Sequence, residues 1–377
     1  MLHLIIFLKV FFLTACTPVD KPKQPLAQLT TVEINNLFHE ANQKFKSDAL
    51  ETELNRLCEN LNGSVLLAFG KQILYKNETG YKRLAKKTPE NVIDSETLFE
   101  LASISKQFTA AAILKLNNED RLSLTDDVTK FLPLFPYKNI TVKHLLTHTS
   151  GLPEYMDFPE KDFNQKEALS NSKLESYMER IKPKILSQPG TRFKYINTNY
   201  ALLALIVEKV AEISFEQYIR TELFAPANLH LTCFATELNT KTNYAKGHLA
   251  DSSERPFHFQ NGVIGDKGVY STVEEVYRWM QAYFIDYQVL PESIVEQAMR
   301  PQNKITKGEP SELYGYGLRI EEDINGYLVY HGGLWRGFHN NMVFRPSDQY
   351  IFIVLSNFRN RAAVGVNTRL LGIIDGV

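Results

Sequence analysis

The order of strand-like and helix-like segments along this chain limits its fold more than any other feature of the sequence. Two short strands are predicted at 63–76, where "GSVLLAFGKQILYK" is split by a Gly-Lys turn, and four more at 314–357. The stretch from about 136 to 261 is mainly helical or irregular, with one long apolar helix at 199–210. Strands near both ends can share one sheet if the middle of the chain folds as a separate lobe. We therefore predict an α/β fold of the α+β type: an antiparallel sheet built from both termini and flanked by helices, with an inserted, mainly helical lobe.

The limits of the two lobes follow from this order. The α/β lobe would comprise about 31–135 and 262–377, and the helical lobe about 136–261. Further helices are predicted within 31–61 and at 361–374. A cleft would lie between the two lobes, and such clefts are preferred places for small-molecule sites.

The first sixteen residues, "MLHLIIFLKVFFLTAC", are mostly apolar but too few to span a bilayer comfortably. Their ending, Leu13-Thr-Ala-Cys16, resembles the lipobox of bacterial lipoproteins, in which the cysteine carries the lipid. This resemblance implies a signal segment at 1–16, a lipid anchor on Cys16 and a Pro-rich tether at 17–30. It also implies an exported lipoprotein that faces the periplasm or the cell exterior, on a membrane that the sequence does not identify. The alternative is an ordinary hydrophobic leader with a chance cysteine.

Composition excludes several classes of function. The net charge of −1 gives no basic surface of the kind that binds nucleic acid. Three widely spaced cysteines argue against a zinc site, and we expect no metal and no cofactor. If Cys16 carries a lipid, Cys58 and Cys233 remain, and the sequence does not decide whether they pair. The oligomeric state is equally open.

The stretch "FELASISKQFTAAAILKL" at 99–116 places a hydroxyl and an amine three residues apart. On a helix, Ser103 and Lys106 would share one face, and the residues that follow are mostly small or apolar. Burial disfavours the charged form of a lysine and so prepares it as a base for a serine nucleophile. A second S-x-x-K, at Ser170 and Lys173, lies in polar surroundings, so we discard it.

Two further stretches offer groups that could complete such a site. In "QPGTRFKYINTNYALL", Tyr195 and Asn197 follow a Pro-Gly turn just ahead of an apolar helix. Beside a lysine ammonium the anion of Tyr195 would be favoured, which would make it a general base. Asn197 can both donate and accept, which suits a substrate amide. The same Y-x-N spacing also occurs at Tyr75 and Tyr137, so the spacing alone is a weak signal.

The other stretch is "YLVYHGGLWRGFHNN", in which His331 precedes two glycines. Glycine lets another backbone or a substrate approach a strand closely. Taken by itself, the simpler interpretation is that Gly332 and Gly333 make a hairpin turn and that His331 only ends a strand.

The three motifs in order, S-I-S-K at 103–106, Y-I-N at 195–197 and H-G-G at 331–333, resemble the serine β-lactamase and penicillin-binding superfamily. The class C branch, with its D-alanyl carboxypeptidases and esterases, is the most similar. Supporting stretches such as "VKHLLTHTSGLPEY" extend the resemblance over 61–357. A β-lactamase-related catalytic domain would then occupy 31–377.

This resemblance implies a role for each motif residue. Ser103 would be the acylated nucleophile, Lys106 would help to deprotonate it, and Tyr195 would exchange protons with the attacking and leaving groups. Asn197 would bind the substrate amide or hydrogen-bond Lys106. The oxyanion would lie between the backbone N–H of Ser103 and that of Leu334.

The third motif departs from the Lys-Thr-Gly that β-lactamases of this family usually carry. A histidine is mostly neutral at pH 7, and Gly332 brings no hydroxyl, so strong recognition of a carboxylate requires another cation. Arg336 is the candidate, with an ordinary exposed cation as the alternative. Trp335 and Phe338 could line an acyl pocket or could equally be core residues.

The sequence thus predicts an exported serine hydrolase that cleaves small esters, amides or D-amino-acid peptides through an acyl-enzyme. The alternatives are a slow-acylating penicillin-binding sensor or envelope protein, and a true β-lactamase, which the histidine motif disfavours. His148 and Ser150 in "THTSGL" are interpreted as part of a loop-shaping motif rather than as a base and a nucleophile.

Overall fold

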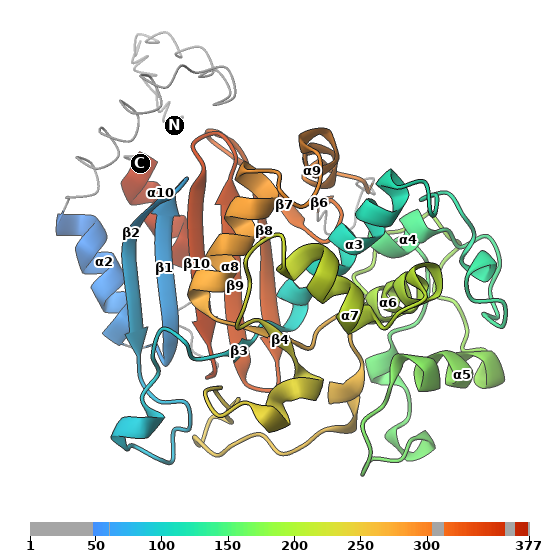
Figure 1. Cartoon of the computed structure of the whole chain (residues 1–377), viewed down its shortest axis with the longest axis horizontal. Helices are drawn as coiled ribbons and strands as arrows, with labels where there is room; N and C mark the ends of the chain where they lie inside the picture. Colours follow the sequence, from blue (N-terminus) through green and yellow to red (C-terminus); the bar gives the residue numbers. More distant parts are fainter. Residues whose placement is uncertain (1–47, 60, 304–312, 359–365, 376–377) are drawn as a thin grey trace, which may run out of the picture.

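A seven-stranded antiparallel sheet forms the centre of the computed structural model, which describes residues 48–59, 61–303, 313–358 and 366–375 (Figure 1). The strand order is β2-β1-β10-β9-β8-β7-β6. The strands are β1 (Gly63–Phe69), β2 (Gln72–Thr79), β6 (Leu313–Tyr314), β7 (Arg319–Asp323), β8 (Gly326–Trp335), β9 (Phe338–Arg345) and β10 (Tyr350–Ser356).

Pairing of β1 with β10 joins the two ends of the chain in this sheet. The two strands are antiparallel, with Gly63 opposite Ser356 and Phe69 opposite Tyr350. Both are buried along their whole length, which explains their nearly continuous apolar sequences. The predicted α/β fold, with a sheet built from both termini, is therefore confirmed.

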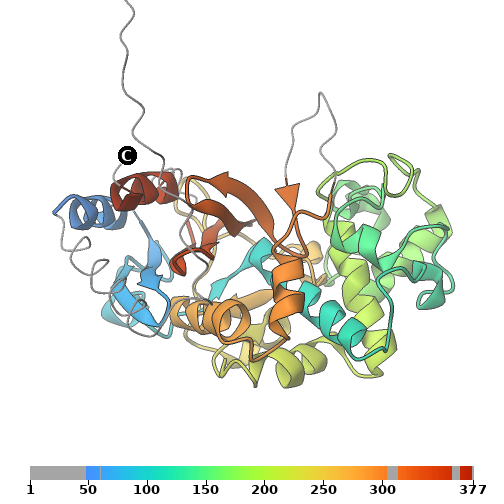
Figure 2. The same ribbon diagram turned by 90° about the horizontal axis from the view of Figure 1, so that it is seen from above.

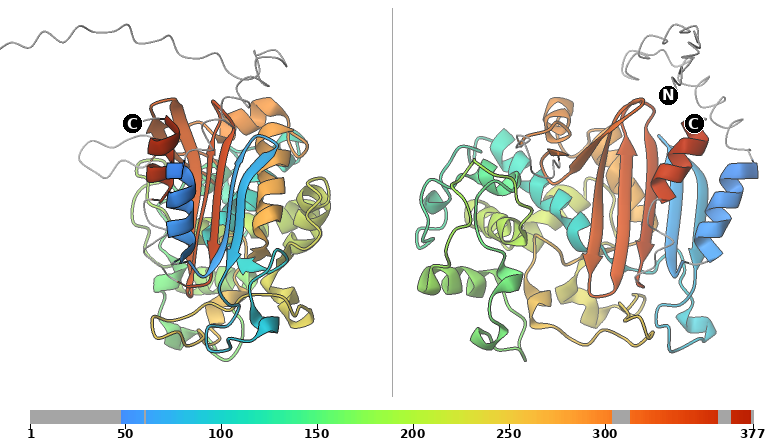
Figure 3. Two further views of the ribbon diagram at one scale, coloured as in Figure 1. Left: turned by 90° about the vertical axis from the view of Figure 1, so that its left-hand side faces the viewer. Right: turned by 180° about the vertical axis from the view of Figure 1, so that it is seen from behind.

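Helices cover both faces of the sheet. Helices α2 (Asp48–Glu59) and α10 (Val366–Asp375) pack side by side on one face (Figure 3). On the other face lie α8 (Val273–Met280), which contacts β1 and β10, and α3 (Lys106–Asn118), which leads into the helical part of the molecule. The sheet has a hydrophobic core on each face, and alternate side chains of β1 point into one or the other. Val65 and Leu67 belong to the core under α2, and Leu66 belongs to the larger core on the opposite face.

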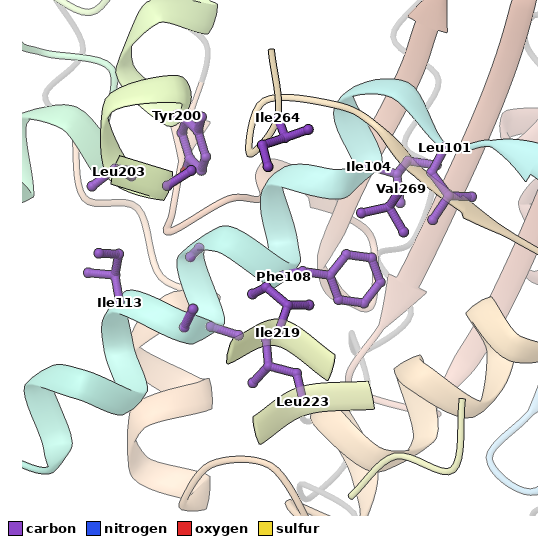
Figure 4. Packing of buried hydrophobic residues seen from close by; sticks show 14 of the residues in the cluster. Leu101, Ile104, Phe108, Ile113, Tyr200, Leu203, Ile219, Leu223, Ile264 and Val269 are labelled. Atoms are coloured by element: carbon purple, nitrogen blue, oxygen red, sulfur yellow. The ribbon is translucent and has the colours of Figure 1, made fainter. Parts of the chain in front are cut away.

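The helical segments gather at one end of the sheet (Figure 2). Helix α6 is at their centre, because it packs against α3 and three further helices and is apolar on nearly every side. Side chains of α3 and α6, with Ile219 and Leu223, fill the space between these helices (Figure 4). The helices are α4 (Val142–Leu146), α5 (Asn171–Ile181), α6 (Asn197–Ala211), α7 (Phe215–Ile219) and, nearer the sheet, α9 (Glu292–Ala298).

A second, small sheet links this helical part to the rest. Its order is β3-β5-β4, with β3 at Phe99–Glu100, β5 at Val269–Ser271 and β4 at Cys233–Phe234. Since β3 precedes the Ser103 turn directly, its pairing with β5 fixes the start of that turn against the loop before β5.

The structure differs from the sequence predictions at a few points. His331 lies inside β8, which continues to Trp335, so the interpretation of Gly332-Gly333 as a hairpin turn is wrong. The turn is made instead by Arg336 and Gly337, both with positive φ (+45° and +99°).

Other predictions lie partly or wholly outside the described residues. The helix predicted within 31–61 is seen as α2, and that at 361–374 as α10 from residue 366 onward. The predicted signal segment, Cys16 and the tether are not among the described residues.

Cys58 and Cys233 are both buried and free, so they do not form a disulfide with each other. No described helix is long and apolar enough to cross a membrane.

Candidate active site

Ser103 and Lys106 lie on consecutive turns and are in hydrogen-bond contact. Ser103 belongs to a 3-10 turn at Ala102–Ser105, and α3 begins at Lys106. The ammonium nitrogen of Lys106 lies 3.0 Å from the Ser103 hydroxyl oxygen. Ala102, just before the serine, has φ of +51°, a conformation that costs a non-glycine residue about 1–3 kcal/mol and is typical of functional sites.

Lys106 is fully buried and has two further acceptors. Its Nζ donates to Oδ1 of Asn197 at 2.7 Å and to the main-chain oxygen of Asp266 at 2.8 Å. Burial lowers the pKa of Lys106 to about 8, and the carboxylates of Asp266 and Glu154 oppose this effect. A lysine with such a pKa can lose its proton near neutral pH and act as a base.

Tyr195, from the loop before α6, lies above Lys106. The Lys106 ammonium is 4.9 Å from the centre of the Tyr195 ring. The phenol oxygen is shielded from solvent and makes no full hydrogen bond, although Ser103 is close enough to lower its pKa somewhat. Burial is the larger effect and raises the pKa of Tyr195, so the expectation that the nearby ammonium favours its anion is wrong for the resting site.

Asn197, the first residue of α6, is fixed by a carboxylate that sequence reasoning missed. Oε2 of Glu154 accepts from the main-chain N–H of Asn197 at 2.8 Å and from its side-chain amide at 3.0 Å. The amide oxygen is thereby turned toward Lys106. Glu154 comes from the "SGLPEY" loop and had no signal beyond its place in that stretch.

His331 is buried on β8, with its ring centre 6.0 Å from that of Tyr195. Nδ1 donates to the main-chain oxygen of Gly332 at 2.7 Å, which leaves Nε2 to accept from the Tyr314 hydroxyl at 3.2 Å. Burial, with Arg319 and Lys106 nearby, holds the pKa of His331 well below its ordinary value. The ring is therefore neutral.

The two glycines after His331 differ in their surroundings. A side chain at Gly333 would place its Cβ 2.2 Å from the main-chain oxygen of Leu101, so β8 and the Ser103 turn meet here without space between them. At Gly332 the nearest atom would be 3.8 Å away, an ordinary contact.

Leu334 lies at an edge of β8 that has no partner strand. The pairing of β7 with β8 ends at Tyr330, and no described strand replaces it beyond that residue. Trp335 and Phe338 close a two-residue hairpin and form a hydrogen-bonded pair, so the next pair, Leu334 and His339, is not hydrogen-bonded. The N–H of Leu334 consequently points away from β9, toward the open edge.

The other candidates from the third motif make hydrogen bonds or core contacts within the protein. Arg336 donates to the main-chain oxygen of Pro256 at 2.8 Å. Trp335 donates through its indole N–H to Asn261 at 3.0 Å, and Phe338 is a buried core residue.

Arg319, on β7, is a cation near the site that the sequence analysis did not single out. Its guanidinium carbon is 4.8 Å from the centre of the Tyr195 ring, and its charge lowers the pKa values of Lys106 and His331. A single arginine in a strand matches no sequence motif. Its place near the site follows only from the packing of β7 beside β8.

The discarded candidates have structural roles. Ser150 donates to Asn199 at 2.6 Å, and the ring of His148 packs against that of Tyr195 with 4.4 Å between the centres and 35° between the planes. Ser170 caps α5 by accepting from the N–H of Lys173. No cluster of three or more His, Cys, Asp or Glu side chains within the described ranges could hold a metal ion.

Comparisons with known proteins agree with this geometry. The Beta-lactamase family matches residues 50–373. A penicillin-binding protein of Bacillus subtilis (strain 168) is 31% identical over 330 residues, which cover 83% of this chain and 72% of the relative.

Two solved structures have the same fold. The penicillin-binding protein from Bacillus halodurans has a TM-score of 0.72 and 26% identity, over 88% of this chain and 99% of that one. The D-amino acid amidase from Ochrobactrum anthropi SV3 has a TM-score of 0.71 and 20% identity, over 91% and 99%, and indicates the fold alone. With its sheet, its three converging motifs and a family match over most of its length, the chain belongs to the β-lactamase family of serine hydrolases, which includes the penicillin-binding proteins.

Proposed function

We propose that the protein hydrolyses small esters, amides or D-amino-acid peptides through an acyl-enzyme on Ser103. The observation that carries this proposal is the position of the Lys106 amine, 3.0 Å from the Ser103 hydroxyl in a buried site. In its neutral form Lys106 accepts the proton of Ser103 as the oxygen attacks the substrate carbonyl. Water later attacks the acyl-enzyme, and the same groups return the proton.

The oxyanion that forms in each step is held by two backbone N–H groups, those of Ser103 and Leu334. The free edge of β8 supports this assignment, because it leaves the Leu334 N–H without a partner strand. Removal of one such donor typically costs about 10²–10³ in rate.

Tyr195 relays a proton between the leaving group and Lys106 as a neutral hydroxyl. His331, also neutral, holds Tyr314 by a hydrogen bond at 3.2 Å and packs beside Tyr195. It takes no charge, so it does not replace the lysine of a Lys-Thr-Gly motif in binding a carboxylate.

Arg319 favours substrates that carry a carboxylate, such as peptides with a free C-terminal D-residue. Its guanidinium carbon lies 4.8 Å from the centre of the Tyr195 ring, and the Lys106 nitrogen lies 4.9 Å from the same ring, so its charge belongs to the site. An Arg319→Gln variant should raise KM for a D-alanyl peptide and leave KM for a neutral p-nitrophenyl ester nearly unchanged. Equal changes for both substrates would remove this assignment.

The central test is hydrolysis of a p-nitrophenyl ester by the mature protein. Ser103→Ala should abolish turnover, while Ser170→Ala, which alters the other S-x-x-K serine at a helix cap, should retain it. Turnover by Ser103→Ala at the wild-type rate would overturn the proposal.

A panel of esters, D-alanyl peptides, a chromogenic cephalosporin and a fluorescent penicillin separates this function from its alternatives. Labelling by the penicillin without turnover of any substrate would favour the sensor or envelope protein. Rapid hydrolysis of the cephalosporin would identify a β-lactamase.

We further propose that the protein is exported and anchored through a lipid on Cys16. The support is the apolar leader and the Leu-Thr-Ala-Cys ending described above. Metabolic labelling with a radioactive fatty acid should mark the wild-type protein but not Cys16→Ser, and labelling of both would refute the assignment.

A further inference from the structure

A buried cluster of charged side chains lies next to Lys106 and takes no part in the steps above. Asp266 is fully buried and Lys267 is 2% exposed, and both precede β5. The Tyr155 hydroxyl donates to Oδ2 of Asp266 at 3.0 Å, and Lys267 Nζ lies 3.4 Å from the same oxygen. Lys267 Nζ also donates to the Tyr155 hydroxyl at 2.5 Å and to the main-chain oxygen of Val263 at 3.0 Å. Burying an ion pair is costly, so this cluster is weak evidence for stability and calls for another explanation.

The main chain of Asp266 touches the base directly. Its carbonyl oxygen accepts from Lys106 Nζ at 2.8 Å, and Oδ1 of Asn197 accepts from the same nitrogen at 2.7 Å. A neutral amine has two N–H groups and one lone pair, so these two acceptors occupy both N–H groups. The lone pair is then left for the third neighbour, the Ser103 hydroxyl at 3.0 Å. The Asp266 carbonyl thus aims the amine at the proton that it has to accept.

We propose that Asp266 is a positioning residue for Lys106: its carbonyl orients the amine, and its carboxylate, held by Tyr155 and Lys267, supplies the buried negative charge that keeps Lys106 protonated in the resting site. The inference rests on the proposed function, in which Lys106 is the base. It assigns to Asp266 the control of the pH at which the Ser103 nucleophile becomes active.

The second carboxylate oxygen of Asp266 supports a role for its charge. Oδ1 is buried and has no hydrogen-bond partner within the described residues. Hydrogen bonds to both oxygens of a carboxylate offset part of its negative charge. When one oxygen accepts no hydrogen bond, more of that charge acts on the other neighbours. Tyr155 and Lys267 both engage Oδ2, so they fix the group without covering Oδ1.

The titratable and charged surroundings of Lys106 agree with this role. Burial lowers the pKa of Lys106, and the charge of Arg319 lowers it further. The charge of Asp266 raises the pKa most, and that of Glu154 also raises it. The other titratable groups that interact with Lys106 are His148 after α4, Tyr195 and Tyr200 around the start of α6, Lys267 before β5, and His331 on β8. Of the two carboxylates that raise the pKa, only Asp266 also gives Lys106 a main-chain acceptor.

The test is the pH profile of kcat/KM for a neutral p-nitrophenyl ester. Asp266→Asn keeps the main-chain carbonyl and the shape of the side chain but removes its charge. The acid limb of the profile should then move to lower pH by about one unit, because Asp266 is the strongest of the charges that raise the pKa of Lys106 and a neighbouring opposite charge typically shifts a pKa by about 1–3 units. Arg319→Gln should move the limb to higher pH. Asp162→Asn is the matched control, since that carboxylate also accepts from a tyrosine hydroxyl, Tyr177 at 2.8 Å, outside the site.

An unmoved limb in Asp266→Asn, or a limb that moves upward, would overturn the inference. Asp266→Ser provides a second charge-free variant should the asparagine not fold. If neither variant folds by circular dichroism while Asp162→Asn does, the role of Asp266 is structural only and the inference is equally overturned. The proposed function is judged separately: it fails if Ser103→Ala is active, whereas this inference fails if Ser103→Ala is inactive and the limb of Asp266→Asn stays in place.

Discussion

Substitution of Gly333 by alanine should disable the site by moving two backbones apart. The added Cβ would lie 2.2 Å from the main-chain oxygen of Leu101, where ordinary contact begins at 3.4 Å. Neither atom is the end of a flexible side chain, so β8 and the Ser103 turn must separate by about 1 Å. A displacement of this size in a catalytic arrangement costs about 10²-fold in rate.

The same overlap should also lower stability, by about 1–3 kcal/mol, as overpacking typically does. Activity is measured as kcat/KM on a p-nitrophenyl ester below the unfolding temperature, and stability by urea unfolding. Gly332→Ala is the control for stability, because its Cβ would meet nothing closer than 3.8 Å. Wild-type kcat/KM in Gly333→Ala would show that the contact between β8 and the turn does not set the geometry of Ser103, and the reasoning would fail.

Two further substitutions probe other buried groups. Arg345→Met should lower the free energy of unfolding in urea by about 3–5 kcal/mol. The reason is that three carboxylates, each within 3.1 Å of the guanidinium, would lose their common cation: Asp323, Asp348 and Asp375. A loss under about 1 kcal/mol would contradict this. Glu154→Gln should move the acid limb of the pH profile to lower pH, but by less than Asp266→Asn, because Glu154 opposes the lowered pKa of Lys106 less strongly; a larger shift would reverse that order.

The sequence was sufficient for the elements and motifs that have a local signature. Apolar runs at both ends of the chain predict the strands that pair as β1 and β10, because a strand buried on both faces needs no polar residues. The three-residue spacing of Ser103 and Lys106 survives although the serine lies in a 3-10 turn, since successive turns still bring the two side chains together.

Residues that act only through tertiary contacts left no such signature. Arg319, Glu154 and Asp266 are single polar residues in a short strand and two loops. Arg319 contacts Tyr195, Glu154 contacts Asn197 and Asp266 contacts Lys106 only because distant segments pack together. The sequence predicts that another backbone or a substrate can approach Gly333 closely. It does not show that this backbone is that of Leu101, because the contact depends on how the Ser103 turn packs against the sheet.

A comparison of Lys106 with Tyr195 favours the amine of Lys106 as the base. With a pKa of about 8, loss of the Lys106 proton at pH 7 costs about 1.4 kcal/mol. The pKa of Tyr195 is raised above its ordinary 10.0, so forming its anion at pH 7 costs more than about 4 kcal/mol. We therefore propose that the amine takes the Ser103 proton and that the phenol passes protons without a resting charge.

These two roles predict different pH profiles. Lys106→Met should reduce kcat/KM to the level of Ser103→Ala at every pH, because the variant lacks the amine that lies in hydrogen-bond contact with the Ser103 hydroxyl. Tyr195→Phe should reduce kcat/KM by about 10²–10⁴-fold, the usual worth of a general acid–base group, and yet keep an acid limb near pH 8. If the limb disappears in Tyr195→Phe and remains in Lys106→Met, the phenol is the base, and the lowered pKa of the buried amine has another purpose.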